Sequence, residues 1–203
     1  RYPATFLGSG ALVGQFDPAW LDQADGAGIT MRDAMVQAGL PATLEAIAAL
    51  ARDPAQYLGF VEVHIEQGPV LNGLDLPLGI VSSINGSRRY LGQISGQASH
   101  AGTTPMALRR DAASAAAELL LFLEQRAAQV PDLVGTIGLL EVPNGSVYVV
   151  PGCCCFSLDI RATTDAVRDA CAADTLAELQ RICERRGVSY SLRETLCAAA
   201  APS

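Results

Sequence analysis

The sequence contains no lysine, so all 14 of its basic residues are arginines, and they stand against 21 acidic residues. The resulting net charge of −7 argues against nucleic-acid binding, which draws its affinity from clustered cations. An anionic membrane surface is excluded on the same ground. No apolar run reaches the roughly 18 residues that a membrane-spanning helix needs. We therefore expect no nucleic acid and no membrane among the partners.

Paired cysteine motifs are also missing. None of the six cysteines forms a C-x-x-C pair, so the sequence gives little support to a cysteine-built zinc site. Cys153, Cys154 and Cys155 are consecutive, and neighbours on a strand point to opposite faces, which hinders pairing. Core filling is favoured over a thiol nucleophile, because a reactive thiolate needs an electropositive setting. We expect reduced thiols and a cytoplasmic location.

The length of 203 residues allows one or two domains, and the texture of the sequence changes near residue 84. Before that point, apolar spacing predicts helices over residues 31–38 and 42–51, and alternation predicts a strand over residues 60–66. The second half follows the order strand, helix, strand, strand, helix, strand, over residues 90–98, 110–128, 133–142, 146–161 (interrupted at Pro151-Gly152), 165–186 and 189–195. This order is typical of a ferredoxin-like sandwich with two helices on one face of an antiparallel sheet.

The chain has only two histidines, and each allows two interpretations. His64 shares a face of the predicted strand with two glutamates, just ahead of a Gly-Pro turn, which suits a metal or substrate site. Zinc takes more ligands than this spacing supplies, so an ordinary surface histidine is favoured from the residues alone. His100 lies in a loop of small and hydroxyl residues before a helix, where free N–H groups can hold an oxyanion. Capping of that helix by Thr103 or Thr104 explains the loop equally well.

Arg161 closes the predicted strand that begins at residue 146. A guanidinium at a strand terminus can clamp a carboxylate through two parallel hydrogen bonds. A surface ion pair with Asp159 or Asp165 is the plainer interpretation, and the sequence spacing slightly favours it. Taken singly, neither the histidines nor this arginine decides the function.

Four segments together resemble one family in their order and spacing. They are residues 63–69 (VHIEQGP), 92–96, 98–106 (ASHAGTTPM) with 109–112 (RRDA), and 156–161 (FSLDIR). The chain resembles the dinuclear-metal amidohydrolases that include N-carbamoyl-L-amino-acid hydrolase, allantoate amidohydrolase and β-ureidopropionase. These are relatives of the aminoacylase and glutamate carboxypeptidase metallopeptidases. The resemblance covers nearly the whole chain.

The resemblance implies a fold of α/β plus α+β class. Residues 1–84 would be part of an open α/β metallohydrolase catalytic domain, residues 85–197 a ferredoxin-like lid and dimerisation domain, and residues 198–203 a tail. It also implies a homodimer formed through the lid, and two divalent metal ions, Zn²⁺ or Mn²⁺, in the intact enzyme. Most of the family's metal ligands and its general-base glutamate have no counterpart here. We therefore expect a central fragment that does not complete a metal centre by itself.

The resemblance assigns roles to individual residues. His64 matches a metal ligand, and Gln67 stands where the family has a substrate-contacting glutamine. His100 matches the lid histidine that polarises the scissile carbonyl, commonly in the partner subunit's active site. Arg161 matches the arginine that receives the substrate carboxylate. Tyr148 occupies the position of a substrate-binding asparagine in the family, which leaves substrate choice open.

The function implied by the resemblance is metal-dependent hydrolysis of linear amide C–N bonds in N-carbamoyl or ureido amino-acid-like acids by the intact protein. A small-molecule acid of this kind is the expected substrate. A non-catalytic dimerisation module without a metal site is the alternative, because one metal-type histidine replaces a full ligand set. A metallopeptidase or aminoacylase specificity is a weaker alternative.

Overall fold

The computed structural model describes Tyr2 and residues 6–202. The chain divides into two compact units, Arg1–Val70 and Leu71–Ser203. The division falls earlier than the predicted boundary at residue 84, because residues 83–84 are hydrogen-bonded within the second unit. Among the described residues, no helix has both the length and the apolar character needed to cross a membrane.

Short helices make up the first unit. They are α1 (Leu7–Leu12), α2 (Met31–Gln37), α3 (Leu44–Ala48) and the 3₁₀ helices η1 (Pro18–Asp22) and η2 (Pro54–Gln56). The hydroxyls of Thr30 and Thr43 begin α2 and α3 by accepting hydrogen bonds from backbone amides three residues on. Ala11, Leu21 and Ile47 form a small core. Both predicted helices are confirmed, although the second is shorter than predicted.

The predicted strand over residues 60–66 is wrong. Residues 57–69 lie in no helix or strand, and the side chains of residues 51–70 are all exposed. A strand needs a neighbour to pair its N–H and C=O groups, and the described part of this unit offers no such neighbour to the segment. Apolar alternation by itself therefore does not make this segment a strand, and its side chains stay exposed, with Val61 90% exposed.

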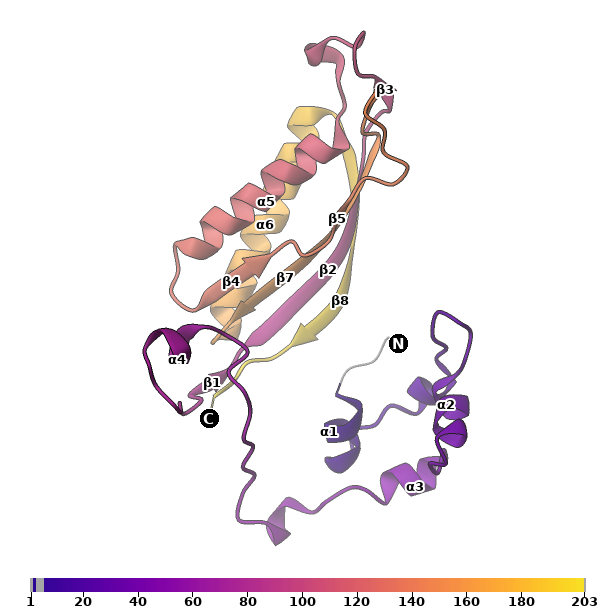
Figure 1. Ribbon diagram of the computed structural model, residues 1–203, viewed down its shortest axis with the longest axis vertical. Coiled ribbons are helices and arrows are strands. Elements are labelled where there is room, and N and C mark those ends of the chain that lie inside the picture. Colours follow the sequence, from indigo (N-terminus) through magenta and orange to yellow (C-terminus); the bar gives the residue numbers. More distant parts are fainter. Residues whose placement is uncertain (1, 3–5, 203) are drawn as a thin grey trace. The chain divides into compact units, whose positions relative to one another are not determined.

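The second unit is an antiparallel sheet covered on one face by two long helices, α5 (Ala112–Ala128) and α6 (Asp165–Arg186) (Figure 1). The strands run in the order β4–β7–β2–β8, and β5 also pairs with β7. Their bounds are β2 (Gly86–Ser95), β4 (Leu133–Thr136), β5 (Leu140–Glu141), β7 (Cys153–Ala162) and β8 (Ser189–Ala198). These elements follow the predicted chain order of strand, helix, strand, strand, helix, strand. The strand predicted over residues 133–142 is broken into β4 and β5.

Local sequence explains the two helices. Asp111 caps α5 by accepting hydrogen bonds from the amides of Ala113 and Ser114 at 2.9 and 3.0 Å. Gly187, with a φ of 63°, ends α6 in the left-handed region where glycine is favoured. The bounds predicted for α6 are confirmed. One apolar stripe of each helix meets alternate residues of β7, namely Cys154, Phe156, Leu158, Ile160 and Ala162, in one continuous core.

The two ends of this sheet differ. At one end, β3 (Ser99–His100) pairs with β6 (Val149–Val150), beside the 3₁₀ helix η3 (Met106–Leu108) (Figure 1). At the other end, β1 (Ser83–Ile84) pairs with β9 (Ala201–Pro202). The predicted tail over residues 198–203 is therefore partly a strand, because Ile84 and Ser83 supply its pairing partner; Ser203 lies outside the described residues. The remaining helix, α4, spans Val70–Gly73.

Candidate functional site

A closed turn positions His100 at one end of the sheet. The amide of Gly102 donates a hydrogen bond to Nδ1 of His100 at 3.0 Å, and the amide of Thr104 donates to the His100 carbonyl at 3.1 Å. Because a backbone amide can only donate, Nδ1 carries no proton, and the neutral ring holds its proton on Nε2. The exposed His100 ring thus presents an N–H donor.

Tyr148 lies beside His100 in the structure. His100 pairs with Val149 in the β3–β6 ladder, and the amide of Ala101 donates to the carbonyl of Tyr148 at 2.9 Å. The Tyr148 side chain is 73% exposed. Two loops far apart in the sequence therefore bring these two predicted site residues together.

His64 and Gln67 form a second group, in the exposed segment of the first unit. Nδ1 of His64 contacts the carbonyl of Ile65 at 2.5 Å. A carbonyl can only accept, so Nδ1 carries the proton and the lone pair of Nε2 is available for a metal. Gln67 has a left-handed φ of 56°, at the bend that leads into α4. The tautomer of His64 is therefore opposite to that of His100.

The donor set does not complete a metal centre. Across Tyr2 and residues 6–202, no group of three or more histidine, cysteine, aspartate or glutamate side chains is placed to hold an ion. A structural or catalytic zinc takes at least three protein ligands. The tautomer of His64 suits a ligand, but the residues present do not fit a dinuclear site on their own.

Arg161 lies near the end of β7 and is held by a carboxylate. Its Nε and one terminal nitrogen donate to the two oxygens of Asp159 at 3.0 and 2.7 Å, and Arg89 donates to the same carboxylate at 3.1 Å. Burial raises the pKa of Asp159, but the hydrogen bonds and charges of Arg161 and Arg89 outweigh it and hold the pKa below its ordinary value. The plainer interpretation, an ion pair with Asp159, describes this contact correctly.

His100 and Arg161 stand near opposite ends of the same sheet. The amide of Gly96 donates to the carbonyl of Gly152, next to the start of β7 and close to the β3–β6 end. Arg161 follows Cys153, the first residue of β7, by eight residues. At about 3.3 Å per residue, this separation is about 26 Å. One small substrate cannot contact both side chains in the second unit of a single chain.

The cysteines divide between two faces of the sheet. Cys154, Cys171 and Cys183 are buried in the core, as predicted, and burial raises the pKa of each of these thiols. Cys153 and Cys155 are half-buried on the other face of β7, so core filling is wrong for these two. All six thiols are free.

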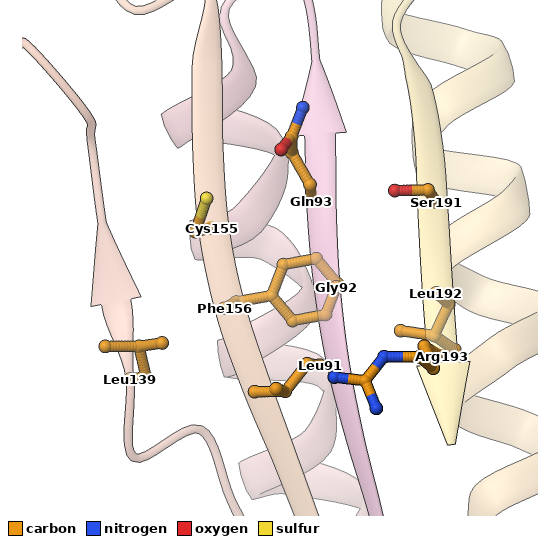
Figure 2. Close-up of a pocket in the computed structure, with 9 residues that line it drawn as sticks. All are labelled: Leu91, Gly92, Gln93, Leu139, Cys155, Phe156, Ser191, Leu192 and Arg193. Atoms are coloured by element: carbon orange, nitrogen blue, oxygen red, sulfur yellow. The ribbon is translucent and has the colours of Figure 1, made fainter. Parts of the chain in front are cut away.

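A shallow pocket lies on the sheet face that the helices leave open (Figure 2). Its lining is Leu91, Gly92, Gln93, Leu139, Cys155, Phe156, Ser191, Leu192 and Arg193. None of these is among the residues assigned a role from the sequence. The two predicted groups therefore lie outside this pocket.

Arg109 belongs to the RRDA motif of the resemblance but was assigned no role from the sequence; in the structure it contacts the turn that carries His100. Its Nε donates to the carbonyl of Thr104 at 3.0 Å, and a terminal nitrogen donates to the carbonyl of Ala101 at 2.6 Å. An arginine shortly after a loop of small residues was the available signal, since guanidinium groups often satisfy loop carbonyls.

Similarity to known proteins covers nearly all of the chain. It is 35% identical over 211 residues to allantoate deiminase from Arabidopsis thaliana, covering 95% of this chain and 40% of that protein. It is 39% identical over 188 residues to N-carbamoyl-L-amino acid amidohydrolase from Geobacillus stearothermophilus, covering 90% of this chain and 46% of that protein. The chain spans less than half of the length of these curated relatives. No protein-family model matches it.

Solved structures give the same result. A hydantoinase/carbamoylase family amidase from Burkholderia ambifaria matches with a TM-score of 0.78 and 32% identity, over 100% of this chain and 49% of that one. A structure of AtUAH in complex with (S)-hydroxyglycine matches with a TM-score of 0.80 and 27% identity, over 100% of this chain and 50% of that one.

These matches place the chain among homologues of enzymes that hydrolyse amides. More specifically, it is similar to part of the allantoate and N-carbamoyl-L-amino-acid amidohydrolases. The resemblance predicted from the histidine motifs is confirmed, and so is the mixed α/β class of the fold.

Proposed function

We propose that the protein hydrolyses a linear amide C–N bond in an N-carbamoyl or ureido derivative of an amino-acid-like acid. The names of the relatives, which act on allantoate and N-carbamoyl amino acids, support this substrate class. The observation that carries the proposal for this chain is the hydrogen bond from the Gly102 amide to Nδ1 of His100. It leaves an N–H donor pointing outward from an exposed loop.

His100 would act on the scissile carbonyl. Attack of water on an amide carbon places negative charge on the carbonyl oxygen, and a fixed N–H donor stabilises that charge more than it stabilises the ground state. Nε2–H of His100 can supply this donor without moving a proton on the ring. Tyr148, next to His100, would contact the substrate at the edge of the same site.

Arg161 would receive the substrate carboxylate, and Gln67 would orient the substrate. Two solved structures of one relative, AtUAH, hold (S)-hydroxyglycine and glyoxylate, both small carboxylic acids, which supports a carboxylate-binding residue among these relatives. Arg161 already holds the carboxylate of Asp159 through two parallel hydrogen bonds, the geometry that a substrate carboxylate would need. A substrate would compete with Asp159 for the guanidinium.

We propose a homodimer in which the second unit, a ferredoxin-like lid, contributes to two active sites. The separation of about 26 Å along β7 supports this arrangement, since His100 and Arg161 of one chain cannot meet on one small acid. Each site would then take His100 from one subunit and Arg161 from the other. The βαββαβ order, with both helices on one face, is the order of such lids.

Mixing two inactive variants tests the shared sites. In the intact protein, His100→Ala and Arg161→Ala are each expected to lose most of the activity, by about 100-fold for His100. After subunit exchange, half of the dimers are mixed, and each mixed dimer has one unaltered site, so about a quarter of the parental activity returns. No recovery in demonstrably mixed dimers would mean that each site takes both residues from one subunit, and would contradict the arrangement.

His64 is our proposed ligand for one of two Zn²⁺ or Mn²⁺ ions of the intact enzyme. Its exposed ring and the lone pair on Nε2 support this role. We assign no catalytic step to the ions, because the described residues do not complete the centre. Plasma mass spectrometry of the 203-residue chain after incubation with Mn²⁺ or Zn²⁺ is expected to find well under one tightly bound ion per chain. Two ions per chain would contradict this view.

The substrate class is tested by a panel of amides. The intact protein with Mn²⁺ is expected to hydrolyse allantoate or N-carbamoyl-L-amino acids faster than N-acetyl amino acids or dipeptides. Preference for the last two would favour the aminoacylase or peptidase alternative. Absence of hydrolysis of every amide by a folded, metal-loaded dimer would favour a non-catalytic dimerisation module.

A further inference from the structure

Arg109 forms hydrogen bonds to the turn that carries His100 at two points. Its guanidinium donates to the carbonyls of Ala101 and Thr104, which flank Gly102 on either side. The side chain is half-buried. A planar guanidinium can satisfy two carbonyls in a fixed geometry, whereas a lysine ammonium would act as a single point charge on a flexible stem.

The contact of Gly102 with the imidazole is close. A Cβ added at Gly102 would lie 3.2 Å from Cε1 and 3.5 Å from Nδ1 of His100, so the ring packs directly against this residue. The Gly102 N–H lies in the planar peptide group that joins Ala101 to Gly102, so the orientation of that group sets its direction. The same group includes the carbonyl of Ala101, which accepts from Arg109 at 2.6 Å.

We propose that Arg109 is a positioning residue that maintains the tautomer of His100. By fixing the carbonyls of Ala101 and Thr104, it keeps the Gly102 N–H aimed at Nδ1, and the ring proton stays on Nε2. Without these two hydrogen bonds the turn relaxes, and the Nδ1–H tautomer becomes populated. In that tautomer Nε2 has a lone pair in place of a donor. The consequence for catalysis rests on the function proposed for His100; the tautomer itself does not.

Nitrogen-15 NMR of the histidine rings tests the proposal directly, because the chain has only two histidines. At about pH 8.5, where imidazoles are neutral, His100 is expected in the Nε2–H form and His64 in the Nδ1–H form. His64→Asn assigns the signals. In Arg109→Ala, the His100 signals are expected to move toward a mixture of tautomers, while those of His64 stay in place.

Arg110→Ala is the matched control, since it removes a neighbouring exposed arginine that does not hold the turn. It should leave the tautomer unchanged. Arg109→Gln, which retains a smaller donor, is the second variant should Arg109→Ala fail to fold, and it is expected to give an intermediate mixture. A single Nε2–H tautomer in a folded Arg109 variant would overturn the proposal.

Kinetics of the intact protein separate this proposal from the function on which it rests. Arg109→Ala is expected to lower kcat by about 10- to 100-fold with little change in KM, because a donor is misplaced and substrate contacts are kept. A mixed tautomer accompanied by unchanged kcat would support Arg109 as the positioning residue and would reject the catalytic role of His100.

Discussion

The segment around His64 and the loop around His100 each hold one histidine of the chain, but they differ in sequence and in how far they are folded: His64 stands among valines, an isoleucine and glutamates, and His100 among small and hydroxyl residues. His100 lies in a strand pair, and its turn is closed by backbone amides and by Arg109. The residues around His64 are exposed and lie in no helix or strand. The difference teaches that a motif becomes a defined site only where neighbouring elements satisfy its backbone.

The same contrast extends to the two units. The second unit has a continuous core between one sheet face and two helices, whereas the small core of the first unit joins only short helices. The apolar residues of the His64 segment contribute to neither of these cores. Most of the stability of the 203-residue chain should therefore reside in the second unit.

The largest expected effect comes from a pair of truncations in the two regions. Phe156→Ala removes a fully buried ring from β7 and should lower the free energy of unfolding of the second unit by about 3–5 kcal/mol. Val61→Ala, in the exposed segment, should change it by less than about 0.5 kcal/mol. Urea denaturation followed by circular dichroism measures both. If Val61→Ala lowered the free energy of unfolding as much as Phe156→Ala, the expected difference between the two regions would be contradicted.

A smaller effect is expected from Arg168, a buried arginine on α6. It donates to Asp165 at 2.7 Å, to Asp169 at 3.0 Å and to the carbonyl of Ala198 at 2.6 Å, and so joins the helix to the end of β8. Arg168→Met removes these three hydrogen bonds, although Asp165 still accepts from the amide of Ala200 and Asp169 from Arg88. The substitution should cost about 1–3 kcal/mol in urea denaturation. A variant as stable as the parent would contradict this view, because it would mean that water replaces the arginine's hydrogen bonds at no cost in free energy of unfolding.

The smallest effect concerns acid stability. The hydrogen bond from Arg186 is the main cause that lowers the pKa of Glu118, burial opposes it, and the charge of Arg185 adds to the lowering. Because the folded pKa is depressed, the stabilisation is complete above the unfolded value of about 4.3 and is lost as the pH falls through the folded value. Partly exposed pairs of this kind contribute about 1 kcal/mol at most.

Glu118→Gln should accordingly flatten the fall in stability below about pH 4.3, with little change in the slope at higher pH. Glu124→Gln, at an exposed position on the same helix, is the matched control and should keep the parental slope. Thermal unfolding at pH 3 to 7 measures the difference. Identical acid slopes for the two variants would mean that the ion pairs of Glu118 contribute nothing measurable to the acid stability of the second unit.

Much of the second unit is predictable from the sequence because its signals are local. The bounds of α6 follow from apolar spacing and from the glycine that ends it, and the alternation of β7 predicts which residues face the helices. The interruption predicted at Pro151-Gly152 is confirmed. The break within the strand predicted over residues 133–142 was not visible, since β4 and β5 pair with separate stretches of β7. The candidate residues were found through the family resemblance, and their roles stay predictions.

The sequence by itself determined the family, the order of elements from residue 86 to residue 198 and the identity of the two histidine motifs. Tertiary structure decided that residues 60–66 form no strand, that Tyr148 lies beside His100, and that Arg161 lies about 26 Å along β7 from Cys153, which is near the His100 end of the sheet. It also decided the tautomers, through one amide and one carbonyl. Periodicity records which face a residue prefers, whereas pairing and hydrogen bonding depend on groups that the chain brings together only when it folds.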